Sequence, residues 1–175
     1  MVSSFAAVKK QLPFLRHGLG LIPIWVLVTA LFFPHPAQAC YGPKLYVGVG
    51  SDSLDSVFYE LVSLYVREKT GVETVRVELK GKSPLDALED EEVDLVPVET
   101  PAAGFDVLIG VGDLIYLLSG PRPLHDLQFT TVAPALRKLG SLLTAEQLAG
   151  LRDRVQQGKP PAAEARRFLM SQRWI

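Results

Sequence analysis

The chain has 175 residues, with 18 lysines and arginines, 19 aspartates and glutamates, and three histidines. This length is enough for one domain with its own core, and the charge balance gives no basic excess that would attract nucleic acid or an anionic membrane. His17 and His35 lie in the N-terminal segment, so His125 is the one histidine that follows it. A multi-histidine zinc or copper site within one chain is therefore excluded. A Ser-His-Asp hydrolase would have to use His125 without a G-x-S-x-G elbow, so we do not expect an enzyme.

Residues 1–39 have the layout of a secretory signal peptide. Lys9, Lys10 and Arg16 form a basic region, residues 18–33 form an apolar run, and Ala37-Gln38-Ala39 provides an A-x-A cleavage site. The apolar run is shorter than the roughly 20 residues that a membrane-spanning helix needs. We therefore predict an exported, periplasmic protein, with an uncleaved N-terminal anchor as the alternative.

Cleavage after Ala39 would make Cys40 the first residue of the mature chain, which is the position that is acylated in bacterial lipoproteins. Ala37 and Gln38 depart from the usual lipoprotein signal, which has Leu three residues before the cysteine, so a free or partnered thiol is the alternative. As the single cysteine, Cys40 cannot form an intrachain disulfide. Removal of residues 1–39 takes away three of the 18 basic residues and no acid, which leaves a formal charge of −4 on residues 40–175.

The first half of the mature chain alternates strands and helices. Residues 44–50 predict a buried strand, and residues 73–81 alternate as a second strand. Between them, one apolar face with i, i+3, i+4 spacing predicts a helix that Ser51 or Ser53 caps and Gly71 ends. A short helix with Ser83 as its cap and Pro84 at its first position precedes a third strand at residues 93–98. This β-α-β-α-β order predicts a parallel sheet.

The second half begins with another apolar stretch, residues 105–120, in which Gly110 and Gly112 separate two short strands or a strand and a turn. The Pro-Arg-Pro sequence after it breaks the chain, and helical segments follow. A capping box from Thr144 to Gln147 starts one of them, and prolines start the last. The irregular residues 101–104 form the main seam between the two halves.

Ligands of open parallel sheets bind beyond the carboxyl ends of the strands. The loops expected there are residues 51–53, 81–83 and 99–101, which offer hydroxyls, one lysine and one glutamate in place of a nucleophile and a base. We expect them to bind a small zwitterionic or cationic solute by hydrogen bonds and charge pairing. The candidate ligand-binding residues are Ser51, Asp52, Lys82, Ser83, Glu99 and Thr100, with Tyr59 and Tyr116 as possible aromatic contacts to a quaternary ammonium.

Simple structural roles compete with these assignments. Asp52 and Asp55 suit the positive N-terminal end of a helix, and their charge would repel the pyrophosphate of a dinucleotide at Gly48-x-Gly50. The acidic residues 89–92 lack the spacing of a calcium loop, and we expect them to be solvated. The pattern predicts neither a cofactor nor a metal site.

Three stretches resemble one family, the periplasmic substrate-binding proteins of ABC transporters of the glycine betaine/choline/carnitine type. Residues 45–79 are similar to the family opening, which runs strand, polar loop, long helix, Lys-Thr-Gly and second strand. Residues 83–100 are similar to the helix, acid, strand and proline unit that follows. Residues 136–175 are similar to the C-terminal end, with a helix pair, a Gly-Lys-x-Pro turn and a last helix.

The resemblance implies an α/β fold, a three-layer lobe of the type II periplasmic-binding-protein fold with a mostly parallel sheet of about five strands. Family members have two lobes, and the first is built from both chain ends. Here the return to the first lobe begins near Phe105, so residues 40–175 would form a single lobe that lacks the second lobe near residues 101–104. The implied function is that of a non-enzymatic binding component, or a derivative of one, in an uptake system for glycine betaine-like solutes, with an ABC permease as partner. The alternative is an exported protein-interaction module whose exposed cleft face meets a partner protein or a second copy of itself.

Overall fold

The structure is a computed structural model that describes residues 42–175. The predicted signal peptide and the lipidation of Cys40 lie outside the described residues. Residues 42–175 belong to one compact unit, and none of the helices among them combines the length and the apolar character needed to cross a membrane.

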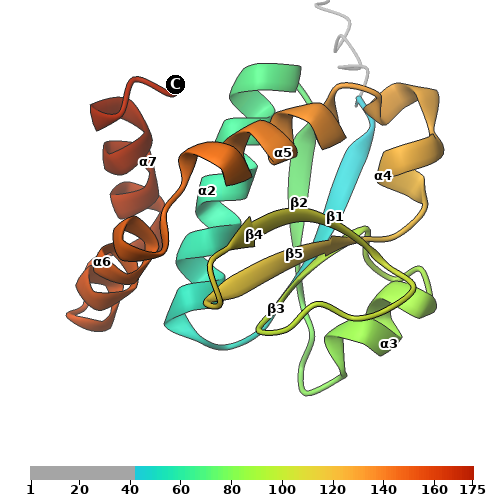
Figure 1. Cartoon of the computed structure of the whole chain (residues 1–175), viewed down its shortest axis with the longest axis horizontal. Helices are drawn as coiled ribbons and strands as arrows, with labels where there is room; N and C mark the ends of the chain where they lie inside the picture. The colour runs from blue at the N-terminus through green and yellow to red at the C-terminus, as the bar shows by residue number, and fades with distance from the viewer. Residues whose placement is uncertain (1–41) are drawn as a thin grey trace, which may run out of the picture. The chain divides into compact units, whose positions relative to one another are not determined.

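The predicted order of the strands and the longer helices is confirmed (Figure 1), and two short helices at residues 122–125 and 127–129, where the sequence predicted only a break, come in addition. The first half contains β1 (Lys44–Val49), α2 (Ser53–Thr70), β2 (Glu73–Glu78), α3 (Pro84–Glu89) and β3 (Leu95–Val98). The second half contains β4 (Asp106–Val111), β5 (Ile115–Ser119), α4 (Arg122–His125), the 3-10 helix η1 (Leu127–Phe129), α5 (Val132–Leu142), α6 (Ala145–Gln156) and α7 (Pro161–Ser171).

The five strands form one mixed sheet in the order β2-β1-β3-β5-β4. The β1–β2 and β1–β3 pairs are parallel, as predicted, whereas β5 pairs antiparallel with both β3 and β4. The expected mostly parallel sheet is therefore confirmed only in part, because two of the four strand pairs are antiparallel. An antiparallel β4–β5 pair follows from the short connection at Gly112, whose φ of 54° turns the chain back at once.

The apolar character of β5 explains why it lies inside the sheet and β4 at the edge. Ile115, Leu117 and Leu118 are all buried, as an interior strand requires. In β4, Val107 remains 43% exposed and a register irregularity lies between Val107 and Ile109. Irregular pairing is common at edge strands, where it hinders pairing with another chain.

Helices cover the two faces of the sheet unequally. On one face, α2 and α5 bury the main core with β1, β4 and β5, and α6 and α7 pack on the far side of α2 from the strands (Figure 1). The close contact of α5 with β4 depends on Gly140, where a Cβ would lie 3.2 Å from a methyl group of Ile109. On the other face, the six-residue α3 covers a small cluster that includes Val96 and Leu118. The expected three layers are present, but one of the helical layers is thin.

The end signals of α2 fit its termini, with one correction. Gly71 ends the helix with φ of 73°, as predicted. The N-terminal cap is Asp52, whose carboxylate accepts a hydrogen bond from the Leu54 N–H at 2.9 Å, so the expected capping by Ser51 or Ser53 is wrong. Aspartate caps as well as serine does, and its charge also suits the helix dipole. The capping box of α6, from Thr144 to Gln147, is confirmed.

An ion pair at the amino end of β3 connects three neighbouring strands. The Asp94 carboxylate is buried, accepts a hydrogen bond from the Tyr46 N–H at 2.6 Å, and pairs with the Arg122 guanidinium. Arg122 also donates to the Lys44 carbonyl at 2.8 Å and lies over the Tyr46 and Phe129 rings. Asp94 therefore holds β1 beside β3 and fixes the chain that leaves β5.

Replacement of Asp94 by alanine should lower the free energy of unfolding by about 2 to 3 kcal/mol. Breaking a fully buried pair costs about 3–5 kcal/mol, and the lower figure reflects the Arg122 side chain, which is 37% exposed. Urea unfolding followed by circular dichroism would measure the change. The matched control is Asp153→Ala, which removes the exposed pair with Arg152 and should cost less than about 1 kcal/mol. Equal losses in the two variants would contradict the role of Asp94.

Candidate functional site

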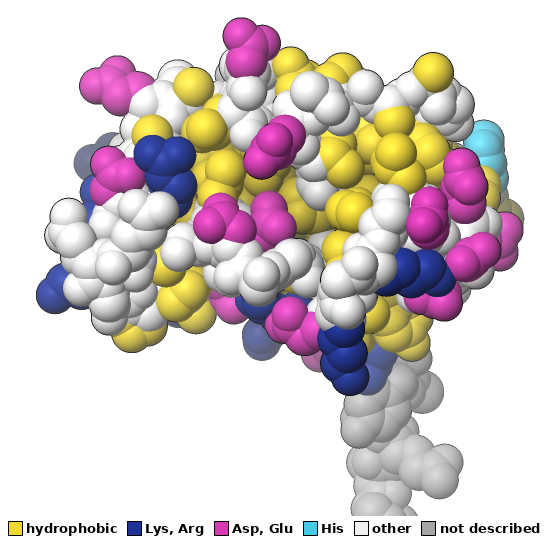
Figure 2. All heavy atoms as spheres, turned by 90° about the horizontal axis from the view of Figure 1, so that it is seen from below, with side chains coloured by type: hydrophobic (Ala, Val, Ile, Leu, Met, Phe, Trp, Pro, Cys, Tyr) yellow, Lys and Arg dark blue, Asp and Glu magenta, His cyan; other side chains and the backbone are white. Residues whose placement is uncertain are grey.

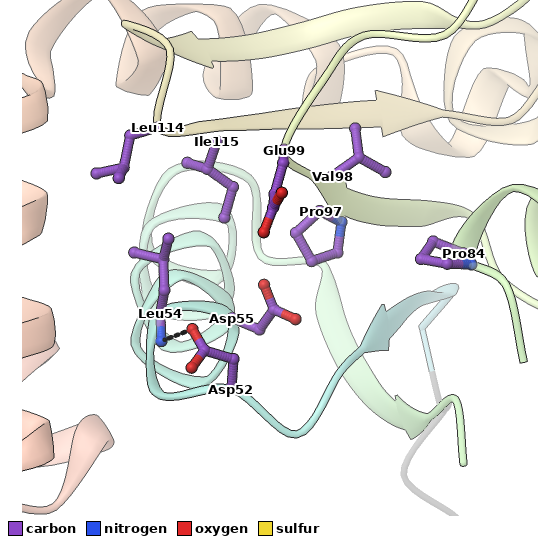
Figure 3. A pocket seen from close by; sticks show the side chains of 9 residues that line it. All are labelled: Asp52, Leu54, Asp55, Pro84, Pro97, Val98, Glu99, Leu114 and Ile115. Carbon is purple, nitrogen blue, oxygen red and sulfur yellow. Dashed lines mark hydrogen bonds between the residues drawn. The ribbon is translucent and has the colours of Figure 1, made fainter. Parts of the chain in front are cut away.

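A cavity of about 340 Å³ opens where β1 and β3 end (Figure 3). Asp52, Asp55 and Glu99 are the three carboxylates in its lining. The remainder of the wall is aliphatic and consists of Leu54, Pro84, Pro97, Val98, Leu114 and Ile115. The Glu99 and Asp55 carboxylates point toward one another across the cavity, with Pro97 on one side and Ile115 on the other (Figure 3).

The sheet topology explains why the cavity lies at this position. The chain leaves β1 to form β2 on one side and later returns to form β3 on the other side of β1. The connecting helices α2 and α3 consequently lie on opposite faces of the sheet. Such a switch point leaves a crevice between the carboxyl ends of the two diverging strands, and it is where open α/β sheets bind ligands.

Pro97 contributes to this crevice. The register between β1 and β3 pairs Val47 with Leu95, whereas β3 pairs with β5 over four residues, from Leu95 to Val98. Pro97 has no N–H to donate to a strand ladder. The parallel ladder with β1 thus does not continue past it, and the two strand ends are free to separate around the cavity.

The Asp55 carboxyl is affected by burial and by the charges around it. Burial raises the pKa of its carboxyl above the ordinary value of 3.8, and the negative charges of Asp52 and Glu99 raise it further. A hydrogen bond from the Gly50 N–H and the charge of Arg76 act in the opposite direction. The close approach requires glycine at position 50, because a Cβ there would overlap the Asp55 carboxylate.

The three carboxylates differ in the hydrogen bonds that they accept from the protein. Asp52 is engaged in capping α2, and Asp55 accepts from the Gly50 N–H. Glu99 is exposed and forms no hydrogen bond or ion pair with other residues of the described chain. The cavity therefore presents negative charge beside aliphatic walls, which is a suitable environment for an organic cation with apolar groups.

Two of the predicted binding residues, Asp52 and Glu99, line the cavity. Ser51, Ser83 and Thr100 are exposed neighbours of lining residues in the chain. Lys82 is not part of the cavity lining. Its ammonium forms ion pairs with Asp90 and Glu92, at 2.7 and 2.8 Å, and both partners raise its pKa.

Tyr116 is not part of the cavity lining. It pairs with Val98 in the sheet, and its ring lies next to Gly110, where a Cβ would be 3.3 Å away. Ile115, the preceding residue of β5, lines the cavity, and successive side chains of a strand point to opposite faces. The Arg76 guanidinium lies over the Tyr59 ring, with its Cζ 5.6 Å from the ring centroid. Tyr59 is likewise outside the cavity lining.

Sequence reasoning did not assign Pro97, Leu114 or Ile115 to the site. It placed Asp55 beside Asp52 at the start of the helix but did not include it among the binding residues, although an acid three residues after Asp52 lies on the same side of the helix. Leu114 and Ile115 had no such signal. They reach the cavity only because β5 is inserted next to β3.

Carboxylates are the charged side chains that line this cavity. No group of three or more His, Cys, Asp or Glu residues within residues 42–175 is arranged to hold a metal ion. The lining contains no lysine, histidine, cysteine or serine beside the carboxylates.

Comparison with known proteins adds no relative: no protein-family model, no curated protein and no solved structure matches the chain.

Replacement of Asp55 by asparagine should stabilise the protein at about pH 7 and should have a smaller effect at about pH 4. The raised pKa means that the folded protein holds this proton more tightly than the unfolded chain. The stability that the protonated Asp55 carboxyl contributes is therefore fully present below the unfolded pKa and is lost as pH rises through the folded pKa. Asparagine stays neutral at both pH values, so it gains over the ionised aspartate chiefly at about pH 7. Urea midpoints of both proteins at the two pH values would measure the effect. Glu89→Gln, at the exposed end of α3, is the control. A gain for Asp55→Asn that is the same at both pH values would contradict the assignment.

Proposed function

We propose that this chain is an exported, non-enzymatic binding protein that holds a small organic cation in the acidic cavity at the switch point. The family to which we assign it by resemblance is the substrate-binding component of ABC uptake systems for glycine betaine-like quaternary amines. The observation that carries the proposal is the combination of three carboxylates with aliphatic walls between β1 and β3.

The cavity favours a cation over a zwitterion. A trimethylammonium group is bulky, apolar at its surface and positively charged, so it can contact aliphatic walls while its charge is balanced by carboxylates. Choline carries that group with a neutral hydroxyl. Glycine betaine carries it with a carboxylate, which would meet the charges of Asp55 and Glu99. We therefore place choline-like solutes ahead of betaine as the ligand class.

The arrangement of the two chain halves supports a lobe of the type II binding-protein fold. That lobe is built from both ends of the chain. Here the C-terminal helices α5, α6 and α7 all pack against α2 from the N-terminal half. The connection 99–105 between the halves is short, and the sheet closes after it with β4 and β5. A single lobe leaves the cavity open on one side, so we expect weak binding in comparison with a ligand enclosed between two lobes.

Calorimetric titration with choline, carnitine, glycine betaine and proline tests the binding proposal. We expect saturable binding of choline, weaker binding of betaine and none of proline. Asp55→Asn and Glu99→Gln should each weaken choline binding about tenfold, as loss of one close charge pair does, while Glu89→Gln should leave it unchanged. A folded protein that takes up none of the four solutes would refute the proposal.

Export is tested separately by mass spectrometry of the protein made in a bacterial host. We expect the chain to begin at Cys40, with an acyl mass on that residue if the lipoprotein signal is used. Recovery of a chain that still carries residues 1–39 would contradict cleavage and favour the N-terminal anchor.

A further inference from the structure

A second groove, whose charged side chains are two arginines and one glutamate, lies at the other end of α2. Its volume is about 370 Å³, and it is lined by Leu64, Arg67, Glu68, Arg166, Met170 and Ile175. The groove lies between the C-terminal half of α2 and α7, and Figure 1 shows the C-terminus beside the upper end of α2. We refer to these six residues as the basic groove and to the cavity of Figure 3 as the acidic cavity.

The side chains of the basic groove carry one net positive charge, from Arg67, Arg166 and Glu68. The acidic cavity carries three carboxylates, and both surfaces include apolar side chains. Arg67 and Arg166 are exposed, and neither forms an ion pair within the described residues. Met170 follows Arg166 by one helical turn and is 56% exposed. An arginine with an apolar neighbour is a natural guest for the acidic cavity, since its planar guanidinium pairs with carboxylates and its stem packs on aliphatic side chains.

The charge separation exceeds what α2 needs for its own stability. Acids at the N-terminal end of a helix and bases at its C-terminal end stabilise the helix dipole, which accounts for Asp52, Asp55 and Arg67. Glu99 follows β3, and Arg166 belongs to α7. They add charge of the same sign to each end of α2 without belonging to that helix. About 18 Å of helix separates Asp55 from Arg67, at roughly 1.5 Å per residue.

From these two surfaces we infer that the chain self-associates head to tail, with Arg166 and Arg67 of one copy entering the acidic cavity of the next. The inference goes beyond solute binding and does not require it. A symmetric dimer through the acidic face is disfavoured, because it would bring the carboxylates of two copies against each other. Figure 2 shows this face, with acidic side chains among hydrophobic ones. A head-to-tail contact instead uses two different surfaces, so it can continue into short oligomers or close into a ring.

Sedimentation equilibrium of the purified protein, with its N-terminus established by mass spectrometry, measures this association. We expect the average mass to rise with protein concentration up to about 1 mM in about 50 mM NaCl. It should fall toward the monomer in about 500 mM NaCl, where the contact charges are screened. A protein that stays monomeric over the whole range in low salt would overturn the inference.

Two double variants identify the surfaces. Arg67→Glu with Arg166→Glu removes the basic groove, and Asp55→Asn with Glu99→Lys removes the acidic cavity. Each should reduce the association constant at least about tenfold when studied alone. An equimolar mixture should form a 1:1 heterodimer that grows no further, because it contains one intact basic groove and one intact acidic cavity. A mixture that remains monomeric would overturn the inference.

The matched control for the arginine variant is Arg137→Glu with Lys138→Glu on α5, which makes the same change in net charge as that variant but outside both surfaces. It should associate as the unmodified protein does, and circular dichroism would verify that all variants are folded. Equal loss in the control would show that net charge alone governs association, and the inference would fall. Calorimetry at low protein concentration measures choline binding by the monomer, and sedimentation measures association in the absence of choline, so failure of one proposal is distinguishable from failure of the other.

Discussion

The Asp94–Arg122 pair is the contact on which the strand order depends. The Asp94 carboxylate, at the amino end of β3, accepts hydrogen bonds from the Tyr46 N–H of β1 and from the Arg122 guanidinium, which follows β5. The Asp94 backbone makes the same two connections, because its N–H donates to the Tyr46 carbonyl at 2.7 Å and its carbonyl accepts from the Gly120 N–H at 2.9 Å. The order β1-β3-β5 is thereby fixed at one end of the sheet, and the opposite, carboxyl end remains open for the cavity.

Structural and functional demands overlap at that carboxyl end. Asp52 caps α2, and Gly50 is required for the approach of Asp55; both features would be needed in a protein with no ligand. Glu99 is different, because it forms no hydrogen bond or ion pair in the described chain, and its negative charge adds to the burial and the Asp52 charge that raise the pKa of Asp55. A charge that costs stability without a structural return is typical of a site that is completed by a bound group. The electrostatics of the cavity thus favour the proposed cationic guest.

The same physical description covers both proposed guests, a choline-like solute and an arginine of another copy. Each has a delocalised or shielded positive charge attached to an apolar body, and each would replace water beside carboxylates and aliphatic walls. An open cavity does not enclose a small solute on all sides, and a protein partner would supply the wall that is absent. The dependence on protein concentration separates the two, because association raises the average mass as the concentration rises, whereas binding of a solute by one chain does not.

By itself the sequence determined the local structure: the strand and helix order, the Gly71 and Thr144–Gln147 end signals, and the acids at the start of α2. These follow from short-range rules of periodicity and capping, which need only neighbouring residues. Tertiary structure decided three further features. β5 lies between β3 and β4, which places Ile115 in the cavity lining. Lys82 forms ion pairs with Asp90 and Glu92 and does not line the cavity. Strand order depends on long-range burial and on the Asp94–Arg122 contact, and the partner of a flexible lysine depends on which acids folding brings within reach.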